Sequence, residues 1–536
     1  MKTKPLIIGF AVTLAIFLGV NLYLYTKILN ATSGEFTYGL DDPYIHLSMA
    51  KNLALHGVWG ISEQNATSSS SSPLWTLILA LVFKIFGTND LVPLYANIFL
   101  SIVLIVQLFK LLSKFSLSPI KIVIWANIVI YGAYIPRVVF MGMEHILHVV
   151  LIVYLVMRFC ELLQDEKKLG LSFFVTVFLM SAARYESMII IGILILTLIY
   201  FKYYKYAILT LISGILPVLI MGIVSLSMGG WLLPNSVLLR RTVFEFRWVF
   251  PLTLMHNFYS SLETRYEYPI IFTLIFSMFL FIDPKGHRKY LSFLSLAGLS
   301  LGTAIIHSMI GYIVLRYFFY ISVMMMVTLA IGYLLIFEDK LLKFEKSFNQ
   351  LETLKFIIAL FLGVGLIWNG VMHTRRAALA SKNIYEQQIQ TAKFFDEYYP
   401  HRGVALNDIG AVSFYSRARI IDVAGLANNK IASLINENEL NSISLKEALF
   451  AEDTKIIALP KVVLQFFSID SLKWKQAGIW KIQKNVVSAS DEVHFFGIND
   501  AEAELLRENL IKFNPRLPKD VIVRIISKDQ RMEESR

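Results

Sequence analysis

Cysteine is almost absent from this chain of 536 residues, which contains only Cys160. A single cysteine excludes an internal disulfide framework and any metal site built from cysteines. Charged residues are also scarce, at 17% of the chain, whereas 56% of the residues are hydrophobic and the mean hydropathy is +0.60. A soluble globule cannot bury that much apolar surface. The composition therefore predicts a polytopic α-helical membrane protein, with Cys160 as a packing residue inside a span.

Acidic residues are fewer than basic ones, and the formal net charge is +11. Such an excess can indicate a nucleic-acid partner, but here much of it lies in short loops between apolar segments. The positive-inside rule accounts for lysine and arginine in such loops. We therefore expect the lipid bilayer as a partner and no nucleic acid.

The apolar segments predict about eleven transmembrane helices in an inner (cytoplasmic) membrane. The first runs from Pro5 to about Leu29 without a cleavage pattern after it, which indicates an uncleaved signal anchor with a cytoplasmic N-terminus. The segment from Leu74 to Phe86 has only about 13 residues, so we interpret it as juxtamembrane or re-entrant. The other spans are expected at about 91–112, 119–135, 145–163, 169–183, 186–201, 205–228, 268–283, 289–309, 311–337 and 355–373.

This topology divides the chain into two predicted domains. Residues 1–373 form a transmembrane module that includes the outer loop 28–90, and residues 374–536 form a soluble α/β domain on the outer, periplasmic side. In that domain we expect helices at 383–399 and 502–513, and strands at 403–407, 420–423, 455–459, 480–484 and 493–496. It contains no nucleotide-binding loop, metal-ligand spacing or nucleophile elbow, so acceptor binding or a lid is its expected role.

Two adjacent carboxylates, Asp41 and Asp42, begin a short predicted helix in the outer loop. Asp42 is placed to cap the helix and Pro43 to occupy its first position, while Gly57 supplies the stop. The apolar spacing predicts an amphipathic helix at an interface, with His46 on its surface. Asp41 lies near the positive end of the helix dipole, where it could accept a proton or a metal ion. The alternative is a purely structural role, in which both carboxylates only cap the helix and keep the loop solvated.

The predicted topology collects most unusual polar residues on the outer side, which implies an outward-facing polar cavity. Each has a structural alternative: Arg184 could pair locally with Glu186, Arg316 could snorkel, and Glu144 and His145 could make structural hydrogen bonds. Trp231 could belong to an aromatic belt or stack on a sugar. The outer set also includes Arg137, Tyr185, the Leu233-Pro234-Asn235 loop and, slightly deeper, His307.

These motifs, in this order, resemble the GT-C glycosyltransferases that use polyprenyl-phosphate sugars, and within them the bacterial arabinofuranosyltransferase-like group. The resemblance covers most of the chain and rests on short motifs, of which the Asp-Asp opening is the most specific. Departures are Ser48 and Lys51 where an arginine is usual, His145 where threonine is common, and Tyr185-Glu186 in place of proline and aspartate. The matching segments are Asp41–Leu47, Lys51–Ala54, Ser72–Trp75, Gly142–Glu144, Ala183–Glu186, Leu233–Asn235, Asn407–Gly410 and Asp422–Leu426.

The resemblance implies a GT-C-like fold and direct inverting transfer of a sugar, such as a pentofuranose, from a polyprenyl-phosphate donor to a cell-envelope glycan, lipid or protein. Asp41, or else Asp42, is then the general base, and Arg316, Arg184, Lys51 and His307 face the departing phosphate. Glu144, His145, Trp231 and Asn235 complete the predicted substrate-binding set. A divalent cation could bind Asp41 or Asp42, but no set of three carboxylates indicates one.

The alternative function is a lipid-linked glycan flippase or transporter. A transporter of this size is expected to show an internal repeat or paired broken helices with charges near the middle of the membrane. Neither occurs in the sequence, and the charges gather on one side, which favours an enzyme that takes a lipid substrate from the outer leaflet.

Overall fold

The computed structural model describes residues 4–165, 168–239, 287–310, 315–336, 350–467 and 472–526. The chain divides into two compact units, each assembled from distant segments. One, here called the membrane unit, comprises Met1–Tyr23, Leu94–Ile220 and Arg240–Arg375. The other, the C-terminal unit, comprises Leu24–Pro93, Met221–Leu239 and Arg376–Arg536, so it includes the whole of the predicted outer loop 28–90.

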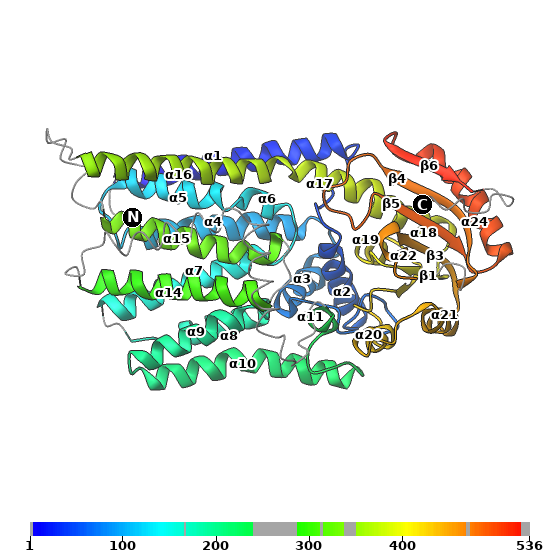
Figure 1. Ribbon diagram of the computed structural model, residues 1–536, viewed down its shortest axis with the longest axis horizontal. Coiled ribbons are helices and arrows are strands. Elements are labelled where there is room, and N and C mark those ends of the chain that lie inside the picture. The colour runs from blue at the N-terminus through cyan, green and yellow to red at the C-terminus, as the bar shows by residue number, and fades with distance from the viewer. Residues whose placement is uncertain are drawn as a thin grey trace. The chain divides into compact units, whose positions relative to one another are not determined.

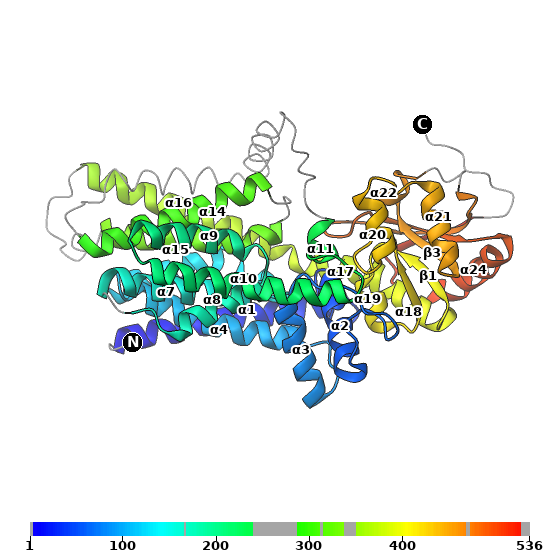
Figure 2. The same cartoon turned by 90° about the horizontal axis from the view of Figure 1, so that it is seen from below.

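The membrane unit is helical, and its long helices run roughly parallel to one another in Figures 1 and 2. Every predicted span from 91–112 onward falls on one of these helices, except 268–283, which lies outside the described residues. The helices are α1 (Lys4–Ala31), α4 (Val92–Leu112), α5 (Pro119–Gly132), α6 (Ile135–Val139), α7 (His145–Asp165), α8 (Leu171–Ala183), α9 (Ser187–Tyr200), α10 (Tyr204–Ser227), α14 (His287–Ile310), η2 (Leu315–Phe318), α15 (Phe319–Ile336) and α16 (Gln350–Arg375).

Six helices in the described part of the chain are long and apolar enough to cross a membrane: α1, α4, α7, α10, α14 and the η2–α15 segment. Helices α5, α8 and α9 are apolar but shorter. In the most apolar window of η2–α15, 94% of the residues are buried, against 22% for α1. The η2–α15 segment is therefore the core of the unit, and α1 exposes most of its surface. The total of about eleven spans stays a prediction.

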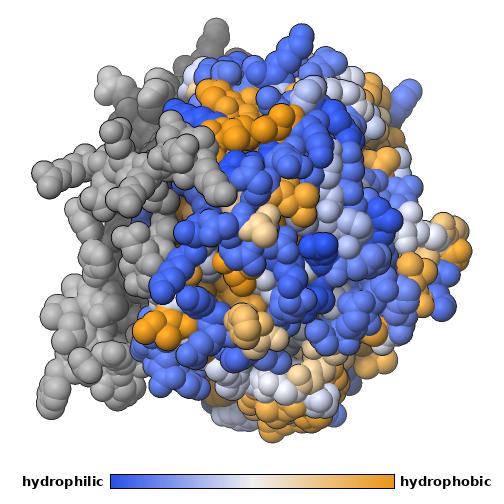
Figure 3. Space-filling model, turned by 90° about the vertical axis from the view of Figure 1, so that its right-hand side faces the viewer, coloured by the Kyte–Doolittle hydropathy of each residue, from blue (hydrophilic) through white to orange (hydrophobic). Residues whose placement is uncertain are grey.

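The C-terminal unit is an α/β structure whose face in Figure 3 is mostly hydrophilic, with scattered apolar patches. Its helices are α2 (Asp42–His56), α3 (Pro73–Phe86), α11 (Asn235–Leu238), α17 (Ala377–Ile384), the π-helical turn η3 (Tyr385–Ile389), α18 (Gln390–Tyr398), α19 (Gly410–Tyr415), α20 (Asn429–Asn436), α21 (Ser442–Ala451), α22 (Lys461–Leu464), α24 (Asp500–Phe513) and η4 (Asn514–Arg516). Its strands are β1 (Gly403–Leu406), β2 (Arg419–Asp422), β3 (Thr454–Pro460), β4 (Lys475–Ile482), β5 (Glu492–Gly497) and β6 (Val521–Ile525).

The six strands form one sheet in the order β2-β1-β3-β5-β4-β6. Strands β2, β1 and β3 are parallel, and β5, β4 and β6 are antiparallel to their neighbours. Because side chains alternate along a strand, Val404 and Leu406 pack into one core and Ala405 into the other. Helices α18 and α24 cover the first core, and α20 and α21 cover the second (Figure 2).

The predicted elements of this unit are confirmed, with shifts of a few residues at their ends. The helix predicted at 383–399 is the continuous run of α17, η3 and α18, and the five predicted strands are β1 to β5. Strand β6 and helices α19, α20 and α21 were not predicted. Helix α19 has only six residues, too few for its apolar spacing to stand out.

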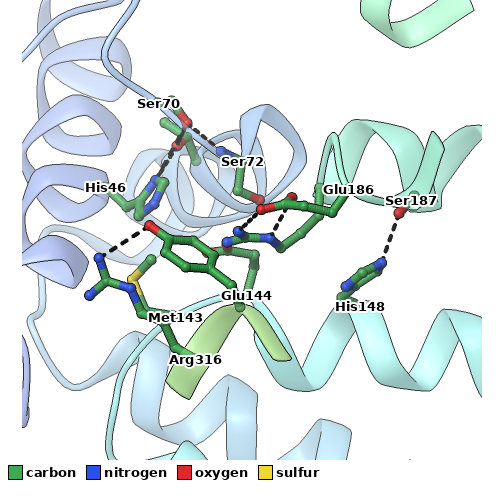
Figure 4. Close-up of polar contacts among 12 residues, drawn as sticks. His46, Ser70, Ser72, Met143, Glu144, His148, Glu186, Ser187 and Arg316 are labelled. Carbon is green, nitrogen blue, oxygen red and sulfur yellow. Dashed lines mark hydrogen bonds and ion pairs between the residues drawn. The ribbon is translucent and has the colours of Figure 1, made fainter. Parts of the chain in front are cut away.

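Helix α2 begins at Asp42 and ends at His56, with Gly57 in the left-handed conformation, as the sequence predicted. The sequence predicted an amphipathic helix at an interface, but α2 has no exposed polar face, because it packs against both α3 and α19 and is buried nearly all round. His46 is also buried, not on the surface. Its Nδ1 lies 3.0 Å from the hydroxyl of Thr76 and 3.4 Å from that of Ser70 (Figure 4).

Candidate active site

Asp41 binds the N-terminus of α19 through both oxygens of its carboxylate. The backbone N–H of Gly410 donates to Oδ2 at 2.6 Å, and that of Ala411 donates to Oδ1 at 2.8 Å. These N–H groups have no partner within α19, and a negative charge is stabilised there. The sequence predicted Asp42 as the cap of α2. Instead, Asp42 is the first residue of that helix, and the capping carboxylate is Asp41, which caps a helix 369 positions away.

Glycine is required at position 410 because Asp41 approaches the backbone so closely. A Cβ atom there would lie 2.1 Å from the carbonyl oxygen of Asp41 and 2.8 Å from its Oδ2. The backbone oxygen cannot move aside cheaply. This contact links the Asp-Asp motif of the first loop to the Asn407–Gly410 motif of the C-terminal segment.

Gly410→Ala is accordingly expected to lower the free energy of unfolding by about 1–3 kcal/mol, because the methyl group must displace the Asp41 backbone. Thermal unfolding of the purified protein measures the effect. Gly170→Ala is the control, since no atom lies within 4 Å of a Cβ there and its φ of −93° suits any residue. A Gly410→Ala variant as stable as wild type would contradict the described contact.

Asp41 is a partly buried residue, and the pKa of its carboxyl is raised to about 7. Burial is the largest cause, followed by the negative charge of Asp408, and Asp42 adds to them. Together they outweigh the two backbone hydrogen bonds, which favour the charged form. Burial also raises the pKa of Asp408, which accepts hydrogen bonds from Gln388 and Asn407. Asp41 can therefore exchange a proton at neutral pH.

Lys51 and Ser48 hold the other end of α19. The ammonium of Lys51 donates to the carbonyl of Phe414 at 3.1 Å and lies 5.4 Å from the centre of its ring. The Ser48 hydroxyl lies 3.2 Å from the carbonyl oxygen of Ser413. Burial lowers the pKa of Lys51. Both residues lie where a donor satisfies the last carbonyls of a helix. Asp41, just before α2, therefore holds the start of α19, and Ser48 and Lys51 of α2 hold its end.

Asn235 joins two further motifs within the C-terminal unit. It is completely buried, and its Nδ2 lies 3.2 Å from the Gly425 carbonyl, 3.4 Å from the Leu426 carbonyl and 2.9 Å from Oδ1 of Asn429. The Leu233–Asn235 loop thereby binds the Asp422–Leu426 motif. Trp231 is only partly buried.

A second polar cluster lies in the membrane unit around Arg184, at the corner between α8 and α9. Its guanidinium forms ion pairs with Glu144 and Glu186, and its Nε donates to Glu186 at 3.1 Å. Arg184 is 3% exposed and Glu144 0%, so the pair with Glu144 is fully buried. The local pair with Glu186 that the sequence offered as an alternative is present, and Glu144 is added to it.

Tyr317 connects Arg184 to Arg316. The guanidinium carbons of the two arginines lie 5.1 Å and 5.2 Å from the centre of the Tyr317 ring. Arg316 also donates to the phenol oxygen at 3.3 Å (Figure 4). One aromatic ring therefore contacts both positive charges, and its electron-rich face attracts them.

Histidines complete the cluster on the neighbouring helices. His307 Nδ1 lies 2.8 Å from the Tyr320 hydroxyl, and His148 Nε2 lies 2.7 Å from the Ser187 hydroxyl, toward which it points in Figure 4. His145 begins α7 and is buried against Phe319. The described residues contain no group of three or more His, Cys, Asp or Glu that could hold a metal ion.

The predicted site residues thus fall into two sets. Asp41, Asp42, Lys51, Trp231 and Asn235 belong to the C-terminal unit, and Glu144, His145, Arg184, His307 and Arg316 belong to the membrane unit. Sequence reasoning missed the partners that hold them: Asp408, Gln388 and Ser413 in one unit, and Tyr317, Tyr320 and His148 in the other. Only Asp408 carried a signal, since it stands in the Asn407–Gly410 motif.

Three comparisons bear on this arrangement. Residues 382–496 match a family model described as a domain of unknown function, DUF8728. No match to a curated protein was found.

Solved structures similar to this chain include ArnT from Cupriavidus metallidurans, in two states. Bound to undecaprenyl phosphate, it has a TM-score of 0.50 and 7% identity; in the apo state the values are 0.51 and 9%. Both alignments cover 91% of this chain and 98% of ArnT. The Archaeoglobus fulgidus oligosaccharyltransferase, tethered to an acceptor peptide, has a TM-score of 0.48 and 11% identity, covering 95% of this chain and 75% of its own. The chain therefore has the fold of ArnT, the GT-C fold, as a polytopic helical membrane protein with a C-terminal α/β domain.

Proposed function

We propose that this chain is an integral-membrane inverting glycosyltransferase, which transfers a sugar from a polyprenyl-phosphate donor to a cell-envelope acceptor on the outer side of the membrane. The observation that carries the proposal is Asp41, whose carboxylate has a pKa of about 7 and is fixed on the N-terminus of α19 by two backbone N–H groups. The fold supports it, because the ArnT structure of the same fold holds undecaprenyl phosphate.

In the proposed reaction Asp41 is the general base. It takes the proton of the acceptor hydroxyl while that oxygen forms a bond to the anomeric carbon, and the bond from that carbon to the lipid phosphate breaks. Each Asp41 oxygen accepts one backbone N–H, which leaves it a second lone pair for the proton. A base with a pKa near the working pH combines the right protonation state with sufficient basicity. Asp42 is the alternative base.

The departing phosphate needs positive or hydrogen-bonding groups. We assign Arg316 to it, with Lys51 and His307 as further candidates. Arg184 already balances Glu144 and Glu186, so its proposed role is to position the cluster around Tyr317. The proposed substrate-binding set also includes Glu144, His145, Trp231 and Asn235. Asn235 contacts the carbonyls of Gly425 and Leu426, so its proposed role is to position the 422–426 loop.

Three more specific parts of the proposal rest on the sequence alone. The transferred sugar is a pentofuranose, such as arabinofuranose. The protein lies in the inner membrane with a cytoplasmic N-terminus, and its C-terminal domain is periplasmic. Assays of sugar release from polyprenyl-phosphate pentose and hexose donors by the purified protein test the function and the sugar together. Donor binding without turnover would favour a flippase.

The pH profile of transfer is expected to report Asp41. Because the base acts only when unprotonated, kcat/KM should fall about tenfold for each pH unit below the pKa of about 7 and level off above it. Asp408→Asn removes a negative charge that raises this pKa, so the midpoint should move to lower pH. Rates measured for both proteins across the neutral range provide the test. A midpoint that Asp408→Asn leaves unchanged would contradict the assignment.

A further inference from the structure

Helix α3 of the C-terminal unit carries a row of apolar side chains that face outward. Its inner face packs on α2, beside which it lies in Figure 2. The outer face is formed by Leu77, Leu81, Ile85 and Phe86, which are 48%, 62%, 62% and 81% exposed. Positions four residues apart are neighbours on a helix surface, so the first three form a continuous row. These four side chains are called the α3 stripe below.

The outer face of α3 is apolar along its whole length. Of the 14 residues of this helix only Thr76 and Lys84 are polar, and Thr76 is buried. The half-buried Leu74, Ile78 and Val82 flank the α3 stripe. A surface helix of a soluble domain turns charged and polar residues toward water. A continuous apolar face of this kind marks a contact with lipid or with another protein.

The connection to the next helix favours lipid over protein. Helix α3 ends at Phe86, and α4, which is long and apolar enough to cross a membrane, begins at Val92. The connecting residues 87–91 span at most about 20 Å even when they are fully extended. Covalent geometry alone therefore keeps the end of α3 near the point where a membrane-spanning helix begins.

We propose that the α3 stripe is embedded in the headgroup region of the bilayer, so that α3 lies in the membrane plane. The sequence left the 74–86 segment as either juxtamembrane or re-entrant. A re-entrant α3 would have to take α2 with it, including the partly exposed Lys51 and the exposed His56, into the hydrocarbon. An interfacial helix instead buries only its apolar face, about 5–10 Å deep.

The α3 stripe also sets the position of Asp41 relative to the lipid headgroups. The Thr76 hydroxyl lies 3.0 Å from Nδ1 of His46 in α2, and the Lys84 ammonium donates to the Ala54 carbonyl at 3.3 Å. These contacts join the two helices near both ends of α2, and Asp41 is the residue just before α2. This step rests on the proposed function: the anchor keeps the general base at the level of a lipid-linked phosphate.

Fluorescence quenching of the full-length protein in nanodiscs of phosphatidylcholine and phosphatidylglycerol tests the proposal. The single cysteine of the chain, Cys160, is buried, so Leu81→Cys carries a small fluorophore at a chosen point of the α3 stripe. Nitroxides on the lipid headgroup and on the fifth or the twelfth acyl carbon, together with aqueous iodide, measure its depth. We expect quenching from the fifth carbon to be at least about twice that from the twelfth, and iodide to quench weakly.

Phe450→Cys is the matched control. Phe450 is an apolar side chain of the same unit, 77% exposed, and it lies on α21 beside the exposed Lys446 and Glu447. Its fluorophore should be quenched by iodide and by none of the lipid nitroxides. Leu77→Cys gives the same reading of the α3 stripe if Leu81→Cys does not fold.

Three results at the α3 stripe would overturn the proposal. Strongest quenching from the twelfth carbon would make α3 re-entrant, quenching by iodide alone would leave it in water, and quenching by neither agent would mean that protein covers it. The measurement needs no turnover. An embedded stripe in a protein without transfer activity would reject the proposed function and keep the anchor, whereas an active protein with a stripe in water would do the reverse.

Discussion

Asp41→Asn is expected to slow sugar transfer at least about a hundredfold, because general-base catalysis contributes typically 10²–10⁴-fold and the amide cannot accept the proton. The loss should appear in kcat as well as in kcat/KM, since the proton is transferred only on the way to the transition state. Initial rates with a polyprenyl-phosphate sugar donor, at a temperature where wild type and variant are both folded, measure it.

The comparison needs a control because Asp41 also holds α19, and asparagine loses one of the two N–H contacts. Asp396→Asn is matched: the Asp396 carboxylate accepts the backbone N–H of Arg417 at 3.0 Å in the same unit, away from the Asp-Asp motif. The Asp396→Asn variant should be somewhat less stable than wild type but should keep most of the rate of sugar transfer. If Asp41→Asn keeps full activity, Asp41 is only a structural residue and Asp42 becomes the candidate base.

Arg184→Met is expected to lower the free energy of unfolding by about 3–5 kcal/mol. Removing one partner of a buried ion pair leaves an uncompensated charge, here that of Glu144, which is 0% exposed, with Glu186 beside it. Detergent-solubilised protein unfolded by heat or denaturant provides the measurement. Glu144→Gln in the same chain should restore part of the loss, since it removes the stranded charge.

Arg158→Met is the matched control in the membrane unit, because Arg158 and Glu161 form a partly exposed pair, 25% and 14% accessible. Pairs of that kind contribute roughly 0–1 kcal/mol. If Arg184→Met is no less stable than Arg158→Met, the ion pairs of Arg184 with Glu144 and Glu186 do not stabilise the fold. Arg184 would then again be a candidate to bind the departing phosphate.

Local signals in the sequence were enough to predict α2 and the first five strands. Asp42-Pro43 starts the helix and Gly57 ends it, and both are effects of neighbouring residues. Strands β1 to β5 stand out as short apolar runs between polar turns. The start of α19 has no such signal, because its N-terminal N–H groups are satisfied by Asp41 from another part of the chain.

The residues of the candidate site could be predicted from the sequence, but the contacts between them could not. Asp41, Glu144 and Arg184 were identified from residue type and position. The pairing of Arg184 with Glu144, however, joins residues 40 positions apart, one just before α7 and one at the corner between α8 and α9. Burial reversed another expectation, since the serine run around Ser70 and the His46 side chain form a buried network. Such networks depend on which helices pack together, and hydrophobic periodicity does not specify that.

The central claim, that this chain transfers a sugar from a lipid phosphate, is tested most directly by purified wild-type protein incubated with polyprenyl-phosphate pentose and hexose donors. The account predicts release or transfer of sugar from at least one donor, with a rate that falls below a pH of about 7. Binding of a lipid-linked sugar without turnover of any donor would contradict it and indicate a flippase.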